Sequence, residues 1–168
     1  MSYLFESYKP ERFWWELVEM GRKGQKTGAG WYRYEKGERT PLTDPVVHQV
    51  IADVAKELGI GQRTFTDDEI LRRLLFASVN EACRILEEGK ALRASDIDVM
   101  WLNGFGFPRY RGGLMFWADG IGVREVYGQV SAWHEQYGAR WKPARMLADL
   151  AQTGGLLREL KGSSTTGS

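Results

Sequence analysis

The sequence predicts an all-α protein built around one long central helix. Apolar residues recur at three- and four-residue spacing in several segments, and each segment begins or ends at a recognisable signal. No segment alternates apolar and polar residues in the manner of a half-buried strand. At 168 residues and 43% hydrophobic, the chain is long enough to bury a substantial core.

The first helix is expected over residues 10–20, because its first residue is a proline, which suits the first helical turn. Phe13, Trp14 and Leu17 recur at helical spacing and form its predicted apolar face. Trp15 falls off that stripe. We expect its side chain to be exposed unless another surface covers it.

A glycine-rich loop over residues 21–30 follows, and it leads into a short extended run over 31–34 that is too isolated to form a sheet. Lys26-Thr27 in this loop hints at a phosphate-binding loop. That motif requires a glycine directly before the lysine, a strand before the loop and a helix after it. Gln25 stands before the lysine and a helix precedes the loop, so we reject this interpretation. A solvated linker over 35–39 completes the region.

The second helix is predicted to begin at Asp44-Pro45, an N-cap followed by proline, and to stop at Gly59. The third begins at Thr66, which forms a capping box with Glu69, and Phe65 with Ile70 occupies the two positions of a hydrophobic staple. This long helix should reach about residue 88. Its apolar stripe is expected to comprise Leu71, Leu75, Ser78, Ala82 and Ile85, with Ile70, Leu74 and Ala77 beside it. So wide a stripe predicts a central helix contacted on two sides.

A fourth helix is expected from a cap at Ser95-Asp-Ile-Asp98 to about Asn103. The segment 103–117 then combines glycines, a proline and five aromatic residues, which predicts a turn between helices that is packed by rings. Shorter helices are predicted over 114–118, 123–137, 144–151 and 156–161. The Gly/Ser/Thr-only segment 162–168 is expected to be disordered.

Composition narrows the class of protein without assigning a function. A net charge of +1 favours neither nucleic acid nor an acidic partner. The one cysteine, Cys83, falls in a helical apolar pattern and is expected to be buried and inert. Because a disulfide framework and a signal peptide are both missing, a cytoplasmic location is predicted. No apolar run reaches the length of a membrane span.

No constellation with interpretable catalytic or metal-ligand spacing is found, so no catalytic, cofactor-binding or metal-binding residue is assigned. His48 and His134 stand apart from any serine, cysteine or paired aspartate, and are read as packing or surface residues. The Arg109-Tyr110-Arg111 run could stack single-stranded nucleic acid, but the flanking glycines and rings favour a packed turn. In such a turn Arg109 or Arg111 would cap helix ends or pair with an acid, and the candidate acids are Asp96, Asp98 and Asp119.

Three passages resemble the C-terminal helical region of 3-hydroxyacyl-CoA dehydrogenases, above all the multifunctional β-oxidation enzymes that join this dehydrogenase to an enoyl-CoA hydratase. The passages are GQKTGAGWYRY over 24–34, ILRRLLFASVNEA over 70–82 with EEG over 87–89, and ASDIDVMWLNGFGFP over 94–108 with RGG over 111–113. The last of these is the most specific. The resemblance covers residues 10–150 approximately.

The resemblance implies that this chain lacks the reacting parts of the enzyme. In the family, NAD is bound by a preceding Rossmann domain and the catalytic His–Glu pair also lies upstream. A catalytic asparagine stands immediately before Arg-Leu-Leu, and Arg72 occupies that position here. The departure is typical of the second, non-catalytic copy of the helical domain. Residues 1–60 would then be the end of a first copy with a linker helix, and residues 61–161 the complete second copy, followed by the disordered segment 162–168.

The function expected from the resemblance is a non-catalytic scaffold that binds no cofactor itself. Two helical domains pack together in such dehydrogenases, so we expect a homodimer or a complex with the missing hydratase and dehydrogenase domains. The alternative is a free-standing acyl-CoA-binding or protein-binding module, in which Lys23 and Lys26 would face the CoA phosphates. Nucleic acid and membrane partners are not expected.

Overall fold

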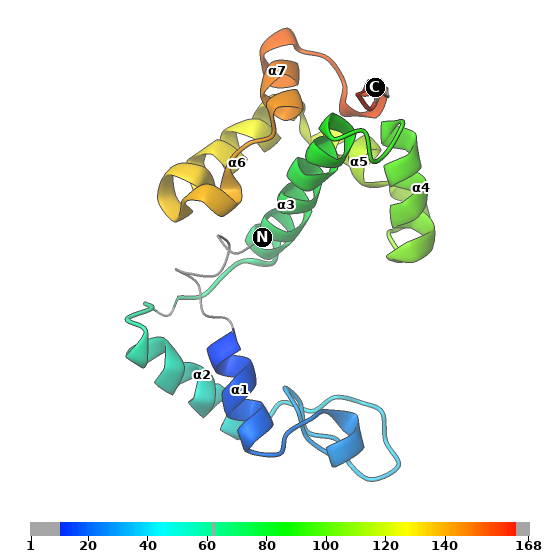
Figure 1. The fold of residues 1–168 in the computed structure, drawn as a ribbon. Helices are drawn as coiled ribbons and strands as arrows, with labels where there is room; N and C mark the ends of the chain where they lie inside the picture. The colour runs from blue at the N-terminus through cyan, green and yellow to red at the C-terminus, as the bar shows by residue number, and fades with distance from the viewer. Residues whose placement is uncertain (1–10, 62, 164–168) are drawn as a thin grey trace, which may run out of the picture. The chain divides into compact units, whose positions relative to one another are not determined.

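The computed structural model describes residues 11–61 and 63–163, and within them it contains seven α-helices and no strand (Figure 1). The predicted all-α class is therefore confirmed. The chain divides into two compact units, Met1–Thr64 and Phe65–Ser168. Within the described ranges, none of the helices combines the length and apolarity required to cross a membrane.

The first unit holds α1 (Glu11–Glu19) and α2 (Pro45–Glu57), which pack against each other. Leu17 is buried and Phe13 half-buried, as predicted, but the Trp14 side chain is 58% exposed, so the prediction that Trp14 belongs to the covered face is wrong. Trp15 is exposed, as expected.

A long connection joins α1 to α2 through the short 3₁₀ turn η1 (Gln25–Thr27). Isolated antiparallel bridges pair Gly24 with Ala29, Ala29 with Arg33, and Arg33 with Leu42, so the extended run forms a loop held by single pairings and no sheet. Asp44 caps α2 as predicted, since its side chain accepts a hydrogen bond from the Val46 N–H. Beyond the helix, Gly59 adopts a positive φ of 65°.

The second unit is a bundle around α3 (Asp67–Glu87), and α4, α5, α6 and α7 all contact this helix. The surrounding helices are α4 (Ala94–Gly104), α5 (Leu114–Ile121), α6 (Val123–Tyr137) and α7 (Arg145–Thr153). The 3₁₀ turns η2 (Arg109–Arg111), η3 (Ala139–Trp141) and η4 (Leu157–Glu159) lie between or after them. The predicted central helix is confirmed, and Thr66 caps it by accepting the Glu69 N–H.

The buried side of α3 differs from the predicted stripe. Phe76, Val79, Cys83 and Leu86 are completely buried, whereas Ile70, Leu71 and Leu74 are about half exposed or more. The buried set is Phe76, Val79, Asn80, Ala82, Cys83 and Leu86. The helix is apolar over more than one side, so its periodicity alone does not indicate which side meets the core.

The start of α4 also differs from the prediction, because the helix begins at Ala94 with Arg93 at the N-cap position, and Ser95 lies inside the first turn. Asp98, expected at the cap, is buried within the helix. At the other end of the unit, the predicted helix over 156–161 is only the 3₁₀ turn η4. The Gly162 and Ser163 N–H groups bond to the Leu92 and Leu86 carbonyls, while residues 164–168 lie outside the described ranges.

Candidate functional site

Asp98 holds the turn over 103–117 in place. Its carboxylate accepts the backbone N–H of Met115 at 2.7 Å and that of Phe116 at 3.3 Å, and thus satisfies the first turn of α5. This helix has no capping side chain of its own, because its N-cap residue is Gly113. Burial raises the pKa of Asp98, and the two backbone hydrogen bonds oppose that shift.

The glycine at position 113 is required by this contact. Its φ of 110° and ψ of 176° suit only glycine. A Cβ atom added there would lie 2.5 Å from the Asp98 Cγ and Oδ1 atoms. Gly113 is therefore explained by close approach to a buried carboxylate, whereas a Cβ atom at Gly112 would lie 2.6 Å from the Phe116 ring. Sequence reasoning missed this role for Asp98, although a helix preceded by Gly-Gly without a capping side chain is a signal that a distant acceptor is needed.

The predicted ring packing of the turn is only partly found. Phe107 is buried and lies edge-on to Trp101, with ring centroids 5.8 Å apart. Phe105 and Tyr110, in contrast, are exposed. Arg109 donates to Asn103, and Arg111 lies over the Tyr110 ring.

The three acids proposed as partners of these arginines are bound elsewhere. Asp96 pairs with Arg93 at 2.9 Å. The Asp119 side chain accepts the backbone N–H groups of Leu157 and Arg158, and Asp98 accepts those of α5. The expectation that Arg109 or Arg111 pairs with one of them is therefore wrong. Their carboxylates satisfy backbone groups or a neighbouring arginine instead.

Arg72 is held in a structural ion-pair network between α3 and α6. Its guanidinium bonds to Asp68 at 2.7 Å and to Glu125, and it lies over the Phe76 ring at 5.7 Å. The hydrogen bonds to Glu125 and to Asp68 raise the pKa of Arg72 above its ordinary value. A side chain fixed in this way joins two helices. The geometry therefore gives Arg72 a packing role.

The second unit exposes an apolar surface on the first two turns of α3. Ile70, Leu71 and Leu74 are 46%, 55% and 62% exposed, and we call these three residues the α3 face. Leu71 and Leu74 are three residues apart, and Ile70 and Leu74 four, so all three lie on one side of the helix. Other aliphatic side chains of the unit, such as Leu92 and Val99, are also exposed, but on α3 these three are the large aliphatic residues that its own domain leaves exposed.

The glycine-rich loop of the first unit satisfies its own backbone. The N–H groups of Gly24, Thr27, Gly28 and Gly30 each bond to a carbonyl within residues 24–32. The Thr27 hydroxyl bonds to the Gly24 and Ala29 carbonyls. A phosphate site requires such N–H groups to point at the ligand. The loop therefore folds on itself, in keeping with the rejection of a phosphate-binding loop.

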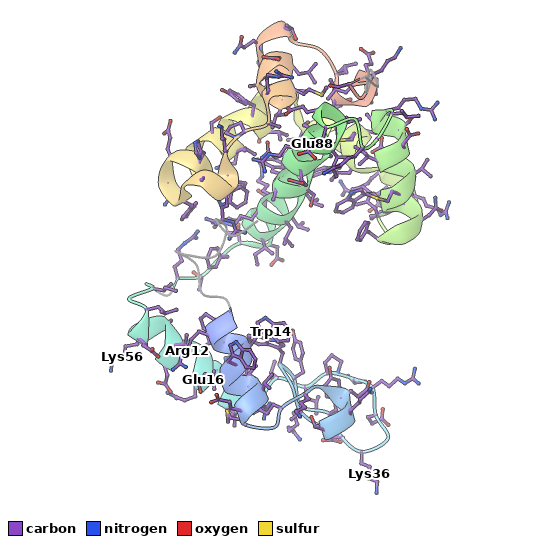
Figure 2. All side chains as sticks on the ribbon, in the orientation of Figure 1. Arg12, Trp14, Glu16, Lys36, Lys56 and Glu88 are labelled. Atoms are coloured by element: carbon purple, nitrogen blue, oxygen red, sulfur yellow. The ribbon has the colours of Figure 1, made fainter. Side chains whose placement is uncertain are left out.

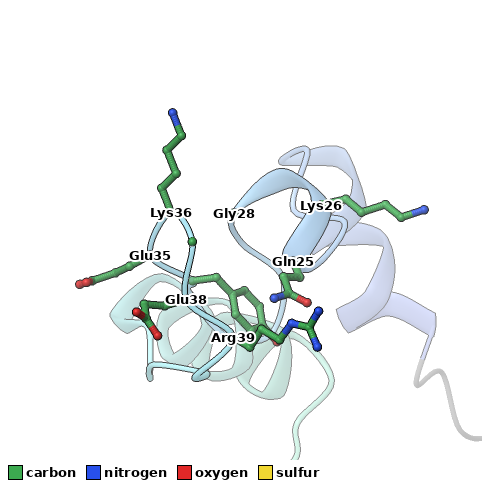
Figure 3. Close-up of a pocket in the computed structure, with 9 residues that line it drawn as sticks. Gln25, Lys26, Gly28, Glu35, Lys36, Glu38 and Arg39 are labelled. Atoms are coloured by element: carbon green, nitrogen blue, oxygen red, sulfur yellow. The ribbon is translucent and has the colours of Figure 1, made fainter.

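A surface pocket of about 460 Å³ lies beside this loop, lined by Gln25, Lys26, Gly28 and residues 34–39. Figure 3 shows that the Lys26 and Lys36 side chains point away from each other and out of the pocket, while Arg39 extends toward Gln25. Glu35 and Glu38 stand in the same lining. The cations do not converge, and the acids offset them, so the pocket has no cradle for the phosphates of CoA.

The remaining titratable candidates have structural roles. Burial raises the pKa of the Cys83 thiol to about 12, which makes it unreactive as a nucleophile and agrees with the predicted inert thiol. His134 bonds through Nδ1 to the Gly138 carbonyl at 3.0 Å, and His48 is exposed. Within residues 11–61 and 63–163, no group of three metal-ligating side chains comes together.

Comparison with known proteins identifies the second unit. The sequence profile of the 3-hydroxyacyl-CoA dehydrogenase C-terminal domain matches residues 70–163. A peroxisomal fatty acid beta-oxidation multifunctional protein, AIM1 of Arabidopsis thaliana, is 43% identical over 151 residues, which is 88% of this chain and 21% of that protein. The peroxisomal bifunctional enzyme of Homo sapiens is 43% identical over 121 residues, covering 71% of this chain and 17% of the relative.

The chain thus spans about a fifth of the length of the curated relatives that it matches. These relatives are named as peroxisomal, and one from Cucumis sativus as glyoxysomal. The prediction of a cytoplasmic protein is therefore wrong. It rested on a single cysteine and the lack of an apolar leader, and neither observation distinguishes the cytoplasm from an organelle that a protein enters without such a leader.

Proposed function

We propose, from the premise that this chain belongs to the 3-hydroxyacyl-CoA dehydrogenase C-terminal domain family, that it is a non-catalytic scaffold of a multifunctional β-oxidation enzyme. The premise rests on the profile match over residues 70–163. The scaffold role rests chiefly on one observation, the α3 face, in which three large aliphatic side chains are exposed next to one another on a single helix. NAD and the reacting groups belong to other domains of the enzyme.

The α3 face gives the scaffold its contact surface. Three large aliphatic side chains half exposed on adjacent turns cost free energy in water, and burial recovers roughly 25 cal/mol for each Å² of apolar surface covered. We propose that this face is covered in a homodimer or by a polypeptide carrying the hydratase and dehydrogenase domains. Arg72 supports the role, because its pairing with Asp68 and Glu125 stiffens the same end of α3.

Light scattering at micromolar concentration tests this surface, with the chain alone and mixed with a polypeptide that carries the missing domains. The wild-type chain should associate in one of these two conditions. The double substitution Leu71→Ser/Leu74→Ser should abolish the association. Leu92→Ser is the matched control, since Leu92 is 74% exposed in the connection between α3 and α4 and lies outside the α3 face. The scaffold role would be contradicted if the wild-type chain is strictly monomeric and also does not bind the polypeptide that carries the missing domains.

A further inference from the structure

We infer that the exposed side of α1 docks on an apolar surface in the part of the multifunctional polypeptide that lies outside this chain. Trp14, Trp15 and Val18 form this surface, and we call them the Trp face. The inference rests on the proposed function, which places the chain within a larger enzyme. It concerns the first unit, whereas the α3 face belongs to the second.

The helix α1 is apolar on two sides, and its own unit covers only one of them. Leu17, on the covered side, is 2% exposed. Trp14 and Trp15 are 58% and 60% exposed, and Val18 is 37% exposed. Val18 follows Trp14 by four residues and Trp15 by three, so the three side chains are neighbours on the helix surface. A helix apolar over so wide an arc is typical of one buried between two surfaces.

Two charged residues of α1, Arg12 and Glu16, lie away from the Trp face. Arg12 pairs with Glu16 at 2.9 Å and with Glu57 of α2 at 3.3 Å. In Figure 2, Arg12 and Glu16 lie on the side of α1 toward α2, and Trp14 projects from the other side. The charges of α1 are thus partly neutralised within the unit. Glu19 follows Trp15 by four residues and is therefore its neighbour on the helix surface. The surface that meets the Trp face is expected to be apolar opposite Trp14, Trp15 and Val18 and polar at its edge, where Glu19 lies.

Trp14 is already held in a defined orientation. Its ring lies edge-on to Trp31, with the centroids 5.7 Å apart and the planes at 86°. A side chain fixed before binding loses little rotamer freedom when it is buried, and tryptophans are enriched among the residues that dominate interfaces. Of the seven tryptophans in the chain, only Trp14 and Trp15 are exposed.

The small core of the first unit indicates where the covering surface comes from. The buried apolar residues of its described part are Leu17, Val47, Val54 and Ala55. So few buried side chains give a two-helix unit little stability of its own. The matched relatives carry about four-fifths of their length outside the aligned region. The rest of the enzyme is thus the part that would cover the Trp face and complete this core. Two other surfaces could cover it instead, namely a second copy of the chain or the chain's own second unit.

Iodide quenching of the chain alone tests whether the Trp face is open. The quenchable share of the tryptophan emission should disappear in Trp14→Phe/Trp15→Phe, because the other five tryptophans are buried or half-buried. If these two tryptophans are shielded in a monomeric chain, the second unit covers them and the inference is overturned. If the wild-type chain is a dimer that Trp14→Glu/Trp15→Glu converts to monomer, a second copy is the occupant, and the inference fails as well.

The docking itself is measured with the Arabidopsis relative from which the aligned region has been deleted, by titrating it into the labelled chain. The wild-type chain should bind, and Trp14→Glu/Trp15→Glu should weaken binding by about tenfold or more, as expected for tryptophan anchors. Leu92→Glu is the exposed control and should bind as the wild type does. Binding by the wild type that only Leu71→Ser/Leu74→Ser weakens would overturn this inference and leave the proposed function intact. No binding by the wild-type chain overturns the inference, and if the chain is also monomeric alone, the proposed function fails with it.

Discussion

Substituting Gly113 with alanine tests the explanation of the turn between α4 and α5. The backbone at this residue has φ 110° and ψ 176°, a region that costs a residue with a Cβ about 1–3 kcal/mol. The new Cβ would also lie 2.5 Å from the Asp98 carboxylate, which must move. That movement weakens the bonds to the Met115 and Phe116 N–H groups, and a buried donor left unsatisfied costs about 1–3 kcal/mol.

Together these effects predict that Gly113→Ala lowers the free energy of unfolding by about 2–6 kcal/mol, a large share of the about 5–15 kcal/mol typical of a domain. Urea unfolding followed by near-ultraviolet circular dichroism measures this loss. The control is Gly128→Ala in the middle of α6, where the added Cβ meets no atom within 4 Å. This control should stabilise the protein by roughly 0.5–1 kcal/mol. A loss below about 1 kcal/mol in Gly113→Ala would refute the close-approach explanation.

Two further perturbations probe the cores of the two units. Leu147 is completely buried in α7, so Leu147→Ala should cost about 2–5 kcal/mol in urea unfolding, and a cost like that of an exposed substitution such as Val46→Ala would contradict the assigned core. In the first unit, the hydrogen bond from Arg22, at 2.6 Å, lowers the pKa of Asp44 below its ordinary value of 3.8. The folded carboxylate thus binds fewer protons than the unfolded one, and the stabilisation is present above that value and lost as the pH falls through the folded pKa. Thermal unfolding of wild type and Asp44→Asn should therefore converge at acid pH, and curves that stay equally far apart would argue against this pair.

Local chemistry made many helix ends predictable from the sequence. Thr66 and Asp44 have side chains that bond to N–H groups two or three residues ahead, so their effect is contained within one turn of chain. The helix over 123–137 is found with the predicted bounds, because a glycine stands on either side of it. Such signals depend on neighbours in the sequence, and no distant partner is needed to read them.

The features that depend on distant partners were not predictable in the same way. Asp98 was read as a local cap, yet the N–H groups that it accepts belong to Met115 and Phe116, in a different helix. The core side of α3 was misplaced because Leu71 and Leu74 are as apolar as Phe76 and Val79, and only the positions of the other helices distinguish them. The same ambiguity affected Trp14. In both helices the misassigned apolar side is the one that we propose for contact with another polypeptide.

The scaffold role is tested most directly by following NADH formation from 3-hydroxyacyl-CoA and NAD with the purified chain as the sole protein. The account predicts no rate above the blank at any chain concentration. Arg72 is tied to Asp68 and Glu125, at the position for which the resemblance implies a catalytic asparagine in the family. A rate of NADH formation that rises in proportion to the chain concentration and saturates with substrate would contradict the scaffold role.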